Sequence, residues 1–489
     1  MNDNSNETTQ IENRRAKLKK IQQNNNNAYP NNFRRSHLAQ QIKTQYNKGE
    51  VVKIAGRIMT RRIMGKASFF NLQDISGNIQ VYVKSNALIK NNDYQKFINL
   101  DLGDIIAIIG YSFTTKKGEV SVYAQEFTLL TKSLRPLPDK FHGLMNVENK
   151  QRQRYLDLIA NSDTKDRFKK RSKIVSNIRS FLEQEDFLEV ETPMMHSIAG
   201  GALAKPFVTH HNTLDLDLYL RIAPELYLKR LIVGGFERVF EMNRNFRNEG
   251  LSSRHNPEFT MVEFYMAYTD YKDMMQLLEK LIVQVAQKVN GHTILEYKKQ
   301  KFDLSQPFEC LTMQQAIKKY NKNIENNDLM SLDKLQQLAK ELQIKVLDNY
   351  GIGKLQLEIF EKTVEENLLA PTFITNFPAE VSPLARRNDF NPFYSDRFEL
   401  YIDAKEIANG FSELNDVTEQ TKIFKQQVQA QQQGDEEAMS YDKDYITALE
   451  YGLAPTSGAG IGVDRLVMLF TACNNIRDVI LFPQLRKNE

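Results

Sequence analysis

Residues 246–268 read FRNEGLSSRHNPEFTMVEFYMAY, and this stretch decides the fold more than any other. Its second half, EFTMVEFYMAY, has the composition of a strand, on which successive side chains point to opposite faces. Val262 and Phe264 then share a face suited to a core, whereas Glu263 and Tyr265 share the other. A carboxylate on a sheet face is costly to bury unless it meets a cation or hydrogen-bond donors. The pattern therefore predicts either a salt-bridged outer face or a binding site.

The strands around this stretch favour an antiparallel sheet. RVFEMNRNF, at 238–246, precedes it, and only a short loop separates the two runs, as in antiparallel pairs. Near the C-terminus, GAGIGVDRL at 458–466 predicts a strand that turns through glycines into a helix. Glycines let a backbone approach another group closely, so a phosphate could bind there.

Two common nucleotide-binding motifs are excluded. GAGIGV has Val463 where the dinucleotide fingerprint GxGxxG requires glycine, and Pro455–Ser457 is a poor preceding strand. The chain also contains no GxxxxGK[ST] sequence. If this protein binds ATP, it does so in another way.

The composition is that of a soluble protein with several domains. The chain has 489 residues, 41% of them hydrophobic and 26% charged. No apolar run approaches a membrane-spanning helix, and the first 30 residues lack a secretory signal, so we expect a cytoplasmic protein. Cys310 and Cys473 stand far apart without CxxC spacing, which favours buried cysteines with no disulfide or zinc role.

The first 50 residues carry most of the excess positive charge. They hold nine Lys/Arg against four Asp/Glu, while the whole chain has a formal net charge of +4. We interpret 1–50 as a basic, partly helical arm, with a short helix at 10–22 and an Asn-rich spacer at 22–32. The arm either touches an RNA backbone or is simply solvated.

The remaining chain divides into a β-rich and a mixed region. Five short β-rich runs in 51–135 predict a small barrel of the oligonucleotide-binding (OB) type, although such a barrel need not bind nucleic acid. LRPLPDKFHGL, at 134–144, carries two prolines and a glycine and indicates a linker, which we place at 136–160. The region 161–489 begins with an amphipathic helix near 163–186 and has a helical insert at about 270–370. The expected fold class is α+β.

Several motifs together resemble one enzyme family. FRNEG followed by RHNPEFT resembles motif 2 of class II aminoacyl-tRNA synthetases, GAGIGVDRL resembles motif 3, and FLEVETPMM at 187–195 resembles motif 1, the dimer element. RIAPELYLKRL at 221–231 and EIANGFSELND at 406–416 resemble the lysyl branch of the aspartyl, asparaginyl and lysyl subgroup. The similarity runs from about residue 10 to the C-terminus.

The resemblance implies activation of L-lysine with ATP and transfer to tRNA(Lys) by a homodimer, with no membrane partner. In that family Arg247 and Arg465 would be catalytic. The residues implied for ATP are Arg247, Glu249, Arg254, His255, Phe259 and Arg465. The residues implied for lysine are Gly201, Glu225, Glu263, Tyr265, Asn409 and Glu413.

The resemblance also implies a cofactor and an RNA-binding face. Glu399 and Glu406 match positions that carry several Mg²⁺ ions, although their spacing alone would also suit ordinary surface acids. The residues implied for the anticodon are Arg62, Phe69, Gln80 and Glu119. Phe69 would stack on a base. The alternative is that Phe69 is buried in the barrel and its neighbour Phe70 lies on the opposite face.

Three other functions share parts of this pattern. An aspartyl- or asparaginyl-tRNA synthetase would need a cation for its short side-chain substrate in place of Glu413 and Tyr265. A related enzyme that attaches lysine to a protein would typically lack the barrel at 51–131. An inactive RNA-binding scaffold would not need Arg247, Arg465 and the acids at 399 and 406.

Overall fold

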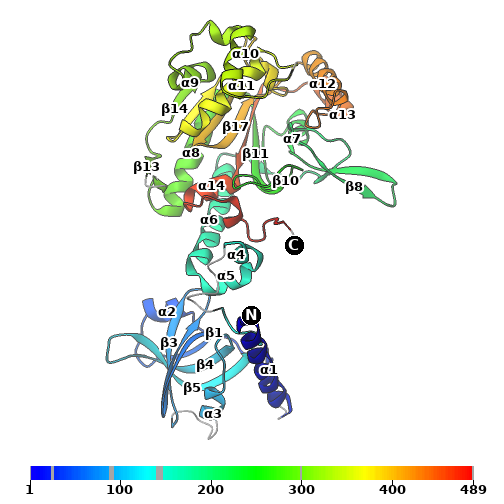
Figure 1. The fold of residues 1–489 in the computed structure, drawn as a ribbon. Coiled ribbons are helices and arrows are strands. Elements are labelled where there is room, and N and C mark those ends of the chain that lie inside the picture. Colours follow the sequence, from blue (N-terminus) through cyan, green and yellow to red (C-terminus); the bar gives the residue numbers. More distant parts are fainter. Residues whose placement is uncertain are drawn as a thin grey trace. The chain divides into compact units, whose positions relative to one another are not determined.

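The computed structural model describes residues 2–23, 27–86, 93–138, 147–297, 300–347 and 349–486. The chain forms two compact units, residues 1–146 and 147–489, which are treated separately below (Figure 1). The five expected barrel strands and a separate, mainly antiparallel sheet accompanied by helices are both present, so the α+β fold class is confirmed.

The N-terminal unit is built on a closed barrel with strand order β1-β2-β3-β5-β4. The strands are β1 (Val51–Met64), β2 (Ala67–Gln73), β3 (Asn78–Lys84), β4 (Ile105–Thr114) and β5 (Val120–Thr131). On β2 and β3 every second residue is buried, so Phe70, Leu72 and Val81 fill the interior. Helices α2 (Ala39–Thr44) and α3 (Asp93–Ile98) add Ile42 and Phe97 to this core.

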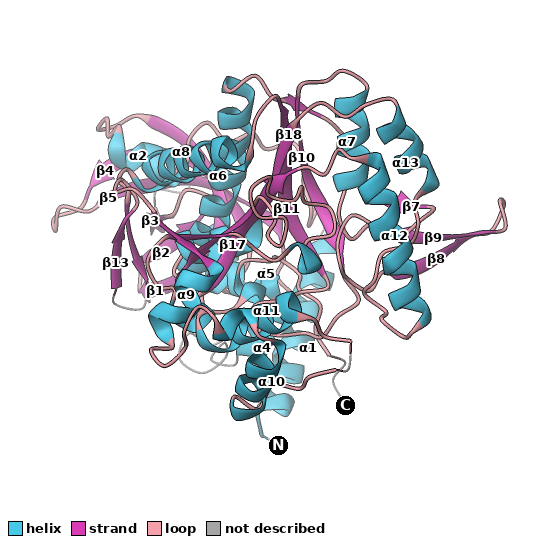
Figure 2. Cartoon of the chain, turned by 90° about the horizontal axis from the view of Figure 1, so that it is seen from above, coloured by secondary structure: helices cyan, strands magenta, loops and turns pink. Residues whose placement is uncertain are grey.

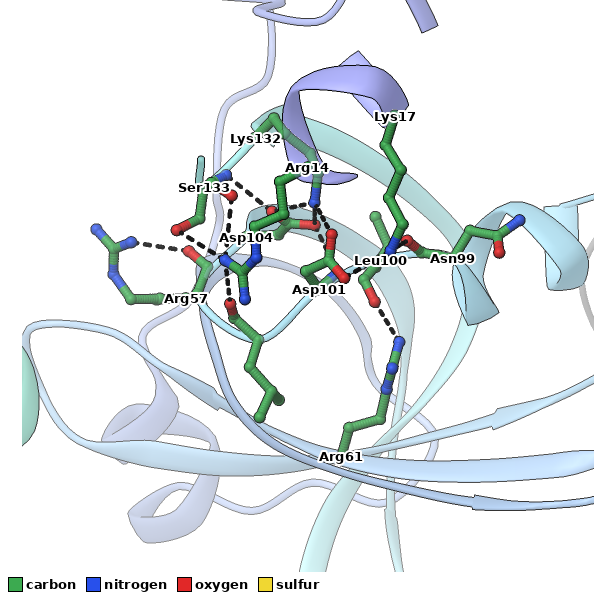
Figure 3. A network of polar contacts seen from close by, with 12 residues as sticks. Arg14, Lys17, Arg57, Arg61, Asn99, Leu100, Asp101, Asp104, Lys132 and Ser133 are labelled. Carbon is green, nitrogen blue, oxygen red and sulfur yellow. Dashed lines mark hydrogen bonds and ion pairs between the residues drawn. The ribbon is translucent and has the colours of Figure 1, made fainter. Parts of the chain in front are cut away.

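Helix α1 (Asn2–Gln23) is docked on the barrel unit, which corrects the expectation of a separate arm at 1–50 (Figure 3). Arg14 is buried and donates to the carbonyls of Leu102, Ser133 and Arg135 at 3.1, 3.1 and 2.9 Å. Lys17 Nζ lies 2.6 Å from a carboxylate oxygen of Asp101. The helix is also longer than the expected 10–22. Its polar sequence does not show which positions would find partners, and residues 24–26 of the spacer lie outside the described residues.

The linker expected at 136–160 is wrong in its second half, which is helical. Residues 139–146 lie outside the described part of the chain, but α4 (Val147–Arg152) and α5 (Arg154–Ala160) are helices of the C-terminal unit. Arg154 is fully buried and donates to Asp157 at 2.7 Å and to the carbonyl of Leu481 at 3.1 Å. A buried, hydrogen-bonded arginine stabilises this segment as part of the domain.

The C-terminal unit contains an eight-stranded sheet of order β14-β15-β16-β17-β18-β11-β10-β6 (Figure 2). Its neighbouring strands are antiparallel except for β14/β15 and β10/β6. The strands are β6 (Leu188–Glu189), β10 (Arg238–Phe246), β11 (Glu258–Ala267), β14 (Glu309–Thr312), β15 (Thr372–Thr375), β16 (Arg397–Ile402), β17 (Lys405–Ser412) and β18 (Thr456–Gly462). The antiparallel β10–β11 pair is confirmed, as is the turn from β18 into helix α14 (Val463–Phe470).

Helices cover one face of the sheet and leave the other for a site. α6 (Ser162–Gln184), α8 (Tyr271–Asn290) and α14 share one apolar core with the sheet. Val262 and Phe264 of β11 are fully buried in that core, as the alternation predicts. Glu263 and Tyr265 therefore point to the opposite face, away from these helices.

The insert expected at about 270–370 is only partly helical. It begins with α8, which packs on the sheet, and contains the hairpin β12 (Ile294–Tyr297) and β13 (Gln300–Asp303) and the sheet strand β14. Helices α9 (Met313–Tyr320), α10 (Leu332–Glu341) and α11 (Ile352–Thr363) share a separate core. Four-residue strands are too short for a reliable alternating pattern, so the sequence does not distinguish them from loops.

The remaining elements border the open face of the sheet. Helix α7 (Glu225–Val233) packs with α12 (Val417–Gln432) and α13 (Lys443–Glu450) in a fourth core. β7 (Met195–His196), β8 (Phe207–His211) and β9 (Leu216–Leu220) form a small sheet, whose β8–β9 hairpin projects from the unit in Figures 1 and 2.

The sequence predicts no membrane-spanning helix and two buried cysteines. Within the described ranges, no helix combines the length and the apolar character that a membrane crossing requires. Both cysteines are free, but only Cys473 is buried, and Cys310 is exposed on strand β14, which corrects the expectation that both are buried.

Candidate active site

Two adjoining cavities lie on the open face of the eight-stranded sheet. Arg247, Met261, Asn409 and Gly460 line both cavities. The first cavity is lined by all six residues that the resemblance implies for ATP, namely Arg247, Glu249, Arg254, His255, Phe259 and Arg465. The second is lined by all six implied for lysine, namely Gly201, Glu225, Glu263, Tyr265, Asn409 and Glu413. Residues from five separate stretches of sequence are thus brought together, with Arg247 at the junction.

The first cavity is rich in arginine. The Arg247 guanidinium carbon lies 5.2 Å from the centre of the Phe259 ring, and burial lowers the pKa of Arg247. Arg465 donates to a Glu406 carboxylate oxygen at 3.0 Å and lies 3.1 Å from Nε2 of His255. It is therefore Arg247 that faces Phe259, whereas Arg465 is held by Glu406 and His255.

His255 is a neutral side chain in this arrangement. Burial, and then the charge of Arg465, lower the pKa of His255 below its ordinary value. Since the guanidinium can only donate, Nε2 of His255 accepts from Arg465, while Nδ1 lies 2.9 Å from the Ser252 hydroxyl. The positive charge of this cavity thus comes from its arginines.

A group of acids lies beside the first cavity. Glu399 accepts from Arg397 at 2.5 Å and from the Tyr401 hydroxyl at 2.6 Å, and burial raises the pKa of Glu399 to about 7. The same hydroxyl lies 3.2 Å from Glu365. Glu406, paired with Arg465, follows on the adjacent strand. Among the described residues, no three acidic, histidine or cysteine side chains are placed to hold a metal ion by themselves.

Sequence reasoning missed Tyr401 and Glu365. Tyr401 lies two residues from Glu399 on β16, so strand alternation could have placed the two side chains on one face. Glu365 comes from the 3₁₀ helix η2 (Glu365–Asn367) after α11, and only the tertiary fold brings it there.

The second cavity is strongly acidic. Glu225, Glu263 and Glu413 are each at most 8% exposed, and Tyr265 donates to Glu263 at 3.2 Å. Burial, followed by the charge of Glu225, raises the pKa of Glu263 to about 8. Burial also raises the pKa of Glu413 well above its ordinary value. Such a cavity gains most from a ligand that brings positive charge.

The glycines of β18 serve this second cavity as well as the first. A Cβ at Gly458 would lie 2.4 Å from both Glu413 Oε1 and a ring carbon of Tyr265, and one at Gly460 would lie 2.9 Å from Met261 Cε. Gly462, by contrast, lines the first cavity. The interpretation that these glycines make room for a phosphate is therefore incomplete, because Gly458 makes room for two side chains of the acidic cavity.

In the N-terminal unit, Arg62, Phe69 and Gln80 lie on the neighbouring strands β1, β2 and β3, and Glu119 directly precedes β5. Arg62 pairs in register with Phe69, and Gln80 donates to Glu119 at 3.0 Å. Phe69 is half-buried, whereas its neighbour Phe70 lies in the core, so a ring remains available on the outer face.

Further aromatic side chains join Phe69. The Tyr82 ring lies 4.7 Å from Phe69 and 5.3 Å from Tyr123, which stacks on Tyr111 at 5.0 Å. Sequence reasoning did not single them out, although the alternation in NIQVYVK and VSVYAQ places Tyr82 and Tyr123 opposite the buried positions.

Comparison with known proteins identifies the class of enzyme. Residues 146–486 match the family described as tRNA synthetases class II (D, K and N), and residues 52–130 match the OB-fold nucleic acid binding domain. The chain is a class II aminoacyl-tRNA synthetase with an OB-fold domain.

Comparison with close relatives identifies the family within this class. The chain is 58% identical over 468 residues to "Lysine--tRNA ligase" of Erwinia tasmaniensis, covering 94% of this chain and 92% of that one. It is 56% identical over 487 residues to the protein of the same name from Yersinia enterocolitica, covering 98% and 96%. The chain belongs to the lysine–tRNA ligase family.

The close approach at Gly458 leads to a prediction. Gly458→Ala places a methyl group against Glu413 and Tyr265, so we expect the KM for lysine in ATP–pyrophosphate exchange to rise at least about tenfold, equivalent to about 1.4 kcal/mol. Gly462→Ala is the control, since its Cβ would meet Arg465 and the Ile407 carbonyl oxygen only at ordinary contact distances, 3.7 and 3.8 Å. An unchanged KM for lysine in Gly458→Ala would contradict the contact.

Proposed function

We propose that this chain activates L-lysine with ATP to lysyl-adenylate and transfers lysine to the 3′ end of tRNA(Lys), releasing AMP and pyrophosphate. The observation that carries this proposal is the sharing of Arg247 between the arginine-rich cavity and the cavity of three buried carboxylates. One side suits a polyphosphate and the other suits a ligand with two ammonium groups.

The first step brings two anions together. A lysine carboxylate oxygen attacks the α-phosphorus of ATP, a new P–O bond forms, and the bond to the pyrophosphate leaving group breaks. Arg247 is placed to contact both reactants, because it lines both cavities. Its planar guanidinium can donate to the carboxylate and to the α-phosphate at once, and Asn409 at the same junction would contact the carboxylate.

The arginine-rich cavity would hold the nucleotide. Phe259 offers a ring face to adenine, Glu249 a carboxylate to its amino group, and Arg254 and Arg465 charge to the terminal phosphates. His255 is neutral in the free chain, so we assign it a hydrogen-bonding role at the γ-phosphate. We assign Arg465 to the adenine face opposite Phe259, which requires Arg247 to turn toward the α-phosphate.

Magnesium is the proposed cofactor, with several ions in each site. Glu399 and Glu406 would hold it together with phosphate oxygens, because Mg²⁺ binds through one or two carboxylates plus phosphates. The fit rests on the raised pKa of Glu399, due first to burial and in part to Glu406, which marks negative charge that a cation would stabilise. When bound, the metal would neutralise phosphate charge.

The acidic cavity would recognise lysine at both ends. Glu225, beside the Gly201 backbone, would accept from the α-ammonium. Glu413 and Tyr265, supported by Glu263, would accept from the ε-ammonium. This charge disfavours aspartate or asparagine, whose short side chains would need a cation or neutral donors here.

In the second step the terminal 3′ hydroxyl of tRNA attacks the carbonyl carbon of lysyl-adenylate, and AMP leaves. The barrel would read the anticodon through Phe69, Arg62, Gln80 and Glu119, since unstacked bases are recognised by stacking and edge contacts. The presence of this barrel disfavours an enzyme that attaches lysine to a protein. Cytoplasmic activity is part of the same proposal.

Glu413 provides the test of lysine recognition. Glu413→Gln leaves the ε-ammonium without its carboxylate, which costs roughly 3–5 kcal/mol. We expect lysine-dependent ATP–pyrophosphate exchange to fall at least about tenfold in kcat/KM. Glu450→Gln, an exposed carboxylate on α13, should retain the exchange rate. Near-normal exchange in Glu413→Gln, or no preference for lysine among the amino acids, would overturn the proposal.

Phe69 provides the test of the anticodon face. Phe69→Ala removes a stacking ring worth roughly 1–3 kcal/mol, so the KM for tRNA(Lys) should rise about fivefold to a hundredfold. Lysine-dependent exchange without tRNA should stay unchanged, because the two cavities lie in the other unit. Aminoacylation of tRNA transcripts by both proteins measures the effect. An equal KM for tRNA would exclude stacking on Phe69.

We propose a homodimer formed through the segment FLEVETPMM. β6 is an edge strand of the eight-stranded sheet, and Leu188, Met194 and Met195 are 49%, 43% and 53% exposed. Exposed edges and apolar side chains of this kind are usually covered.

Light scattering at micromolar concentration tests the dimer. We expect about twice the 56.7 kDa of one chain. Met195→Asp should shift the mass toward the monomer, because an unpaired carboxylate is costly in an interface. Phe390→Asp, at another exposed apolar residue, should not. A monomer in the unaltered chain would contradict the proposal.

A further inference from the structure

A buried lysine lies behind the acidic cavity and does not line it. Lys229, on α7, has a fully buried side chain, and its Nζ lies 2.6 Å from Glu225 Oε1. The same ammonium forms a close ion pair with Glu413 and lies 5.4 Å from the centre of the Phe411 ring. Glu225 and Glu413 are the two carboxylates proposed to bind the α- and ε-ammonium groups of the substrate. One resident cation therefore bridges both ends of the proposed lysine pocket.

The formal charges of the pocket show what this cation does. Glu225, Glu263 and Glu413 supply three carboxylates, and Lys229 supplies one ammonium, which leaves two negative charges. Lysine has two ammonium groups, and its own carboxylate faces Arg247. Without Lys229 the pocket would hold three buried carboxylates against two ammonium groups, and a buried carboxylate without a partner takes up a proton.

Two other charged groups near the pocket are already paired. Arg397 of β16 is bound to Glu399 at 2.5 Å, and Glu241 of β10 to Arg221 at 2.5 Å. The groups that face Lys229 and its carboxylates are Glu263 and Tyr265 on β11, Tyr445 on α13 and Arg397 on β16. Glu241 on β10 and Arg247 after β10 act on the neighbouring Glu263. Lys229 is thus the cation that directly bridges Glu225 and Glu413.

We infer that Lys229 is a positioning residue that sets lysine specificity: it fixes the Glu225 and Glu413 carboxylates at their spacing and favours their ionised forms for the two substrate ammonium groups. This inference rests on the proposed function. Burial raises the pKa of Glu225, and the Lys229 ammonium opposes that rise. Burial alone would lower the pKa of Lys229, but Glu225 and Glu413 raise it above its ordinary value. Burial raises the pKa of Glu413, and the Lys229 ammonium opposes that rise.

The inference gives a pH signature that a purely structural residue would not have. In Lys229→Met, one more carboxylate is protonated near pH 7 and must lose that proton when lysine binds. Glu263, with a pKa of about 8, titrates in both proteins. We therefore expect the KM for lysine of Lys229→Met to be at least about tenfold higher near pH 7. The ratio of the two KM values should then fall by up to about tenfold per pH unit toward pH 8.5.

The experiment is lysine-dependent ATP–pyrophosphate exchange between about pH 7 and 8.5, comparing the unaltered chain with Lys229→Met. The KM for ATP and kcat should stay within about threefold, since Lys229 lies outside the first cavity. Lys132→Met is the matched control. Lys132 is another buried lysine that bridges two carboxylates, those of Asp101 and Asp104, but it lies in the barrel unit and should not affect exchange.

Lys229→Gln serves as a second variant, because it keeps a donor for Glu225 without the charge and should show the same pH-dependent ratio. An unchanged KM for lysine, or a pH-independent rise shared by lysine and ATP, would overturn the inference. So would failure of both Lys229 variants to fold while Lys132→Met folds, because that result would assign Lys229 a structural role only. Absence of lysine-dependent exchange in the unaltered chain would instead overturn the proposed function.

Discussion

The cost of removing carboxylates from water is the constraint on which the catalytic unit depends. One face of the eight-stranded sheet is sealed by α6, α8 and α14, and its apolar side chains stabilise the fold. The other face holds Glu225, Glu263 and Glu413, each almost fully buried. Such a face is stable only when cations or donors compensate it. Lys229, the Tyr265 hydroxyl and, by our proposal, the substrate itself provide that compensation.

The cost of burying charge also shapes the adjoining cavity, where the buried groups are cations. Arg247 and Arg465 lie close together there, with Glu249 and Glu406 nearby. Burial lowers the pKa of Arg247, so a polyanion would relieve an unfavourable environment as well as form contacts. Because Arg247 lies at the boundary, by our proposal an arrangement that is costly in the free protein would favour the meeting of two anionic reactants.

The outer face of the barrel presents aromatic side chains, whereas the open face of the eight-stranded sheet carries buried charges. Phe69, Tyr82 and Tyr123 are in contact on the outer face, while Phe70 and Val81 on the same strands fill the interior. A strand with period two can supply a core and a stacking surface at once. Buried charge has a separate role in this unit, where Arg14, Lys132, Asp101 and Asp104 hold α1 and the barrel together (Figure 3).

Periodicity and motifs are local, so the barrel strands, the β10–β11 pair, the β18–α14 turn and the family could all be predicted from the sequence. It also identified residues that line both cavities, through resemblance. Features that depend on long-range contacts could not be predicted from local sequence patterns. The docking of α1 through Arg14, the helices at 147–160 and the short strands within 270–370 depend on long-range partners. Lys229 looks like any helical lysine in ELYLKRL, and only the fold places its ammonium between Glu225 and Glu413, where desolvation makes one positive charge decisive.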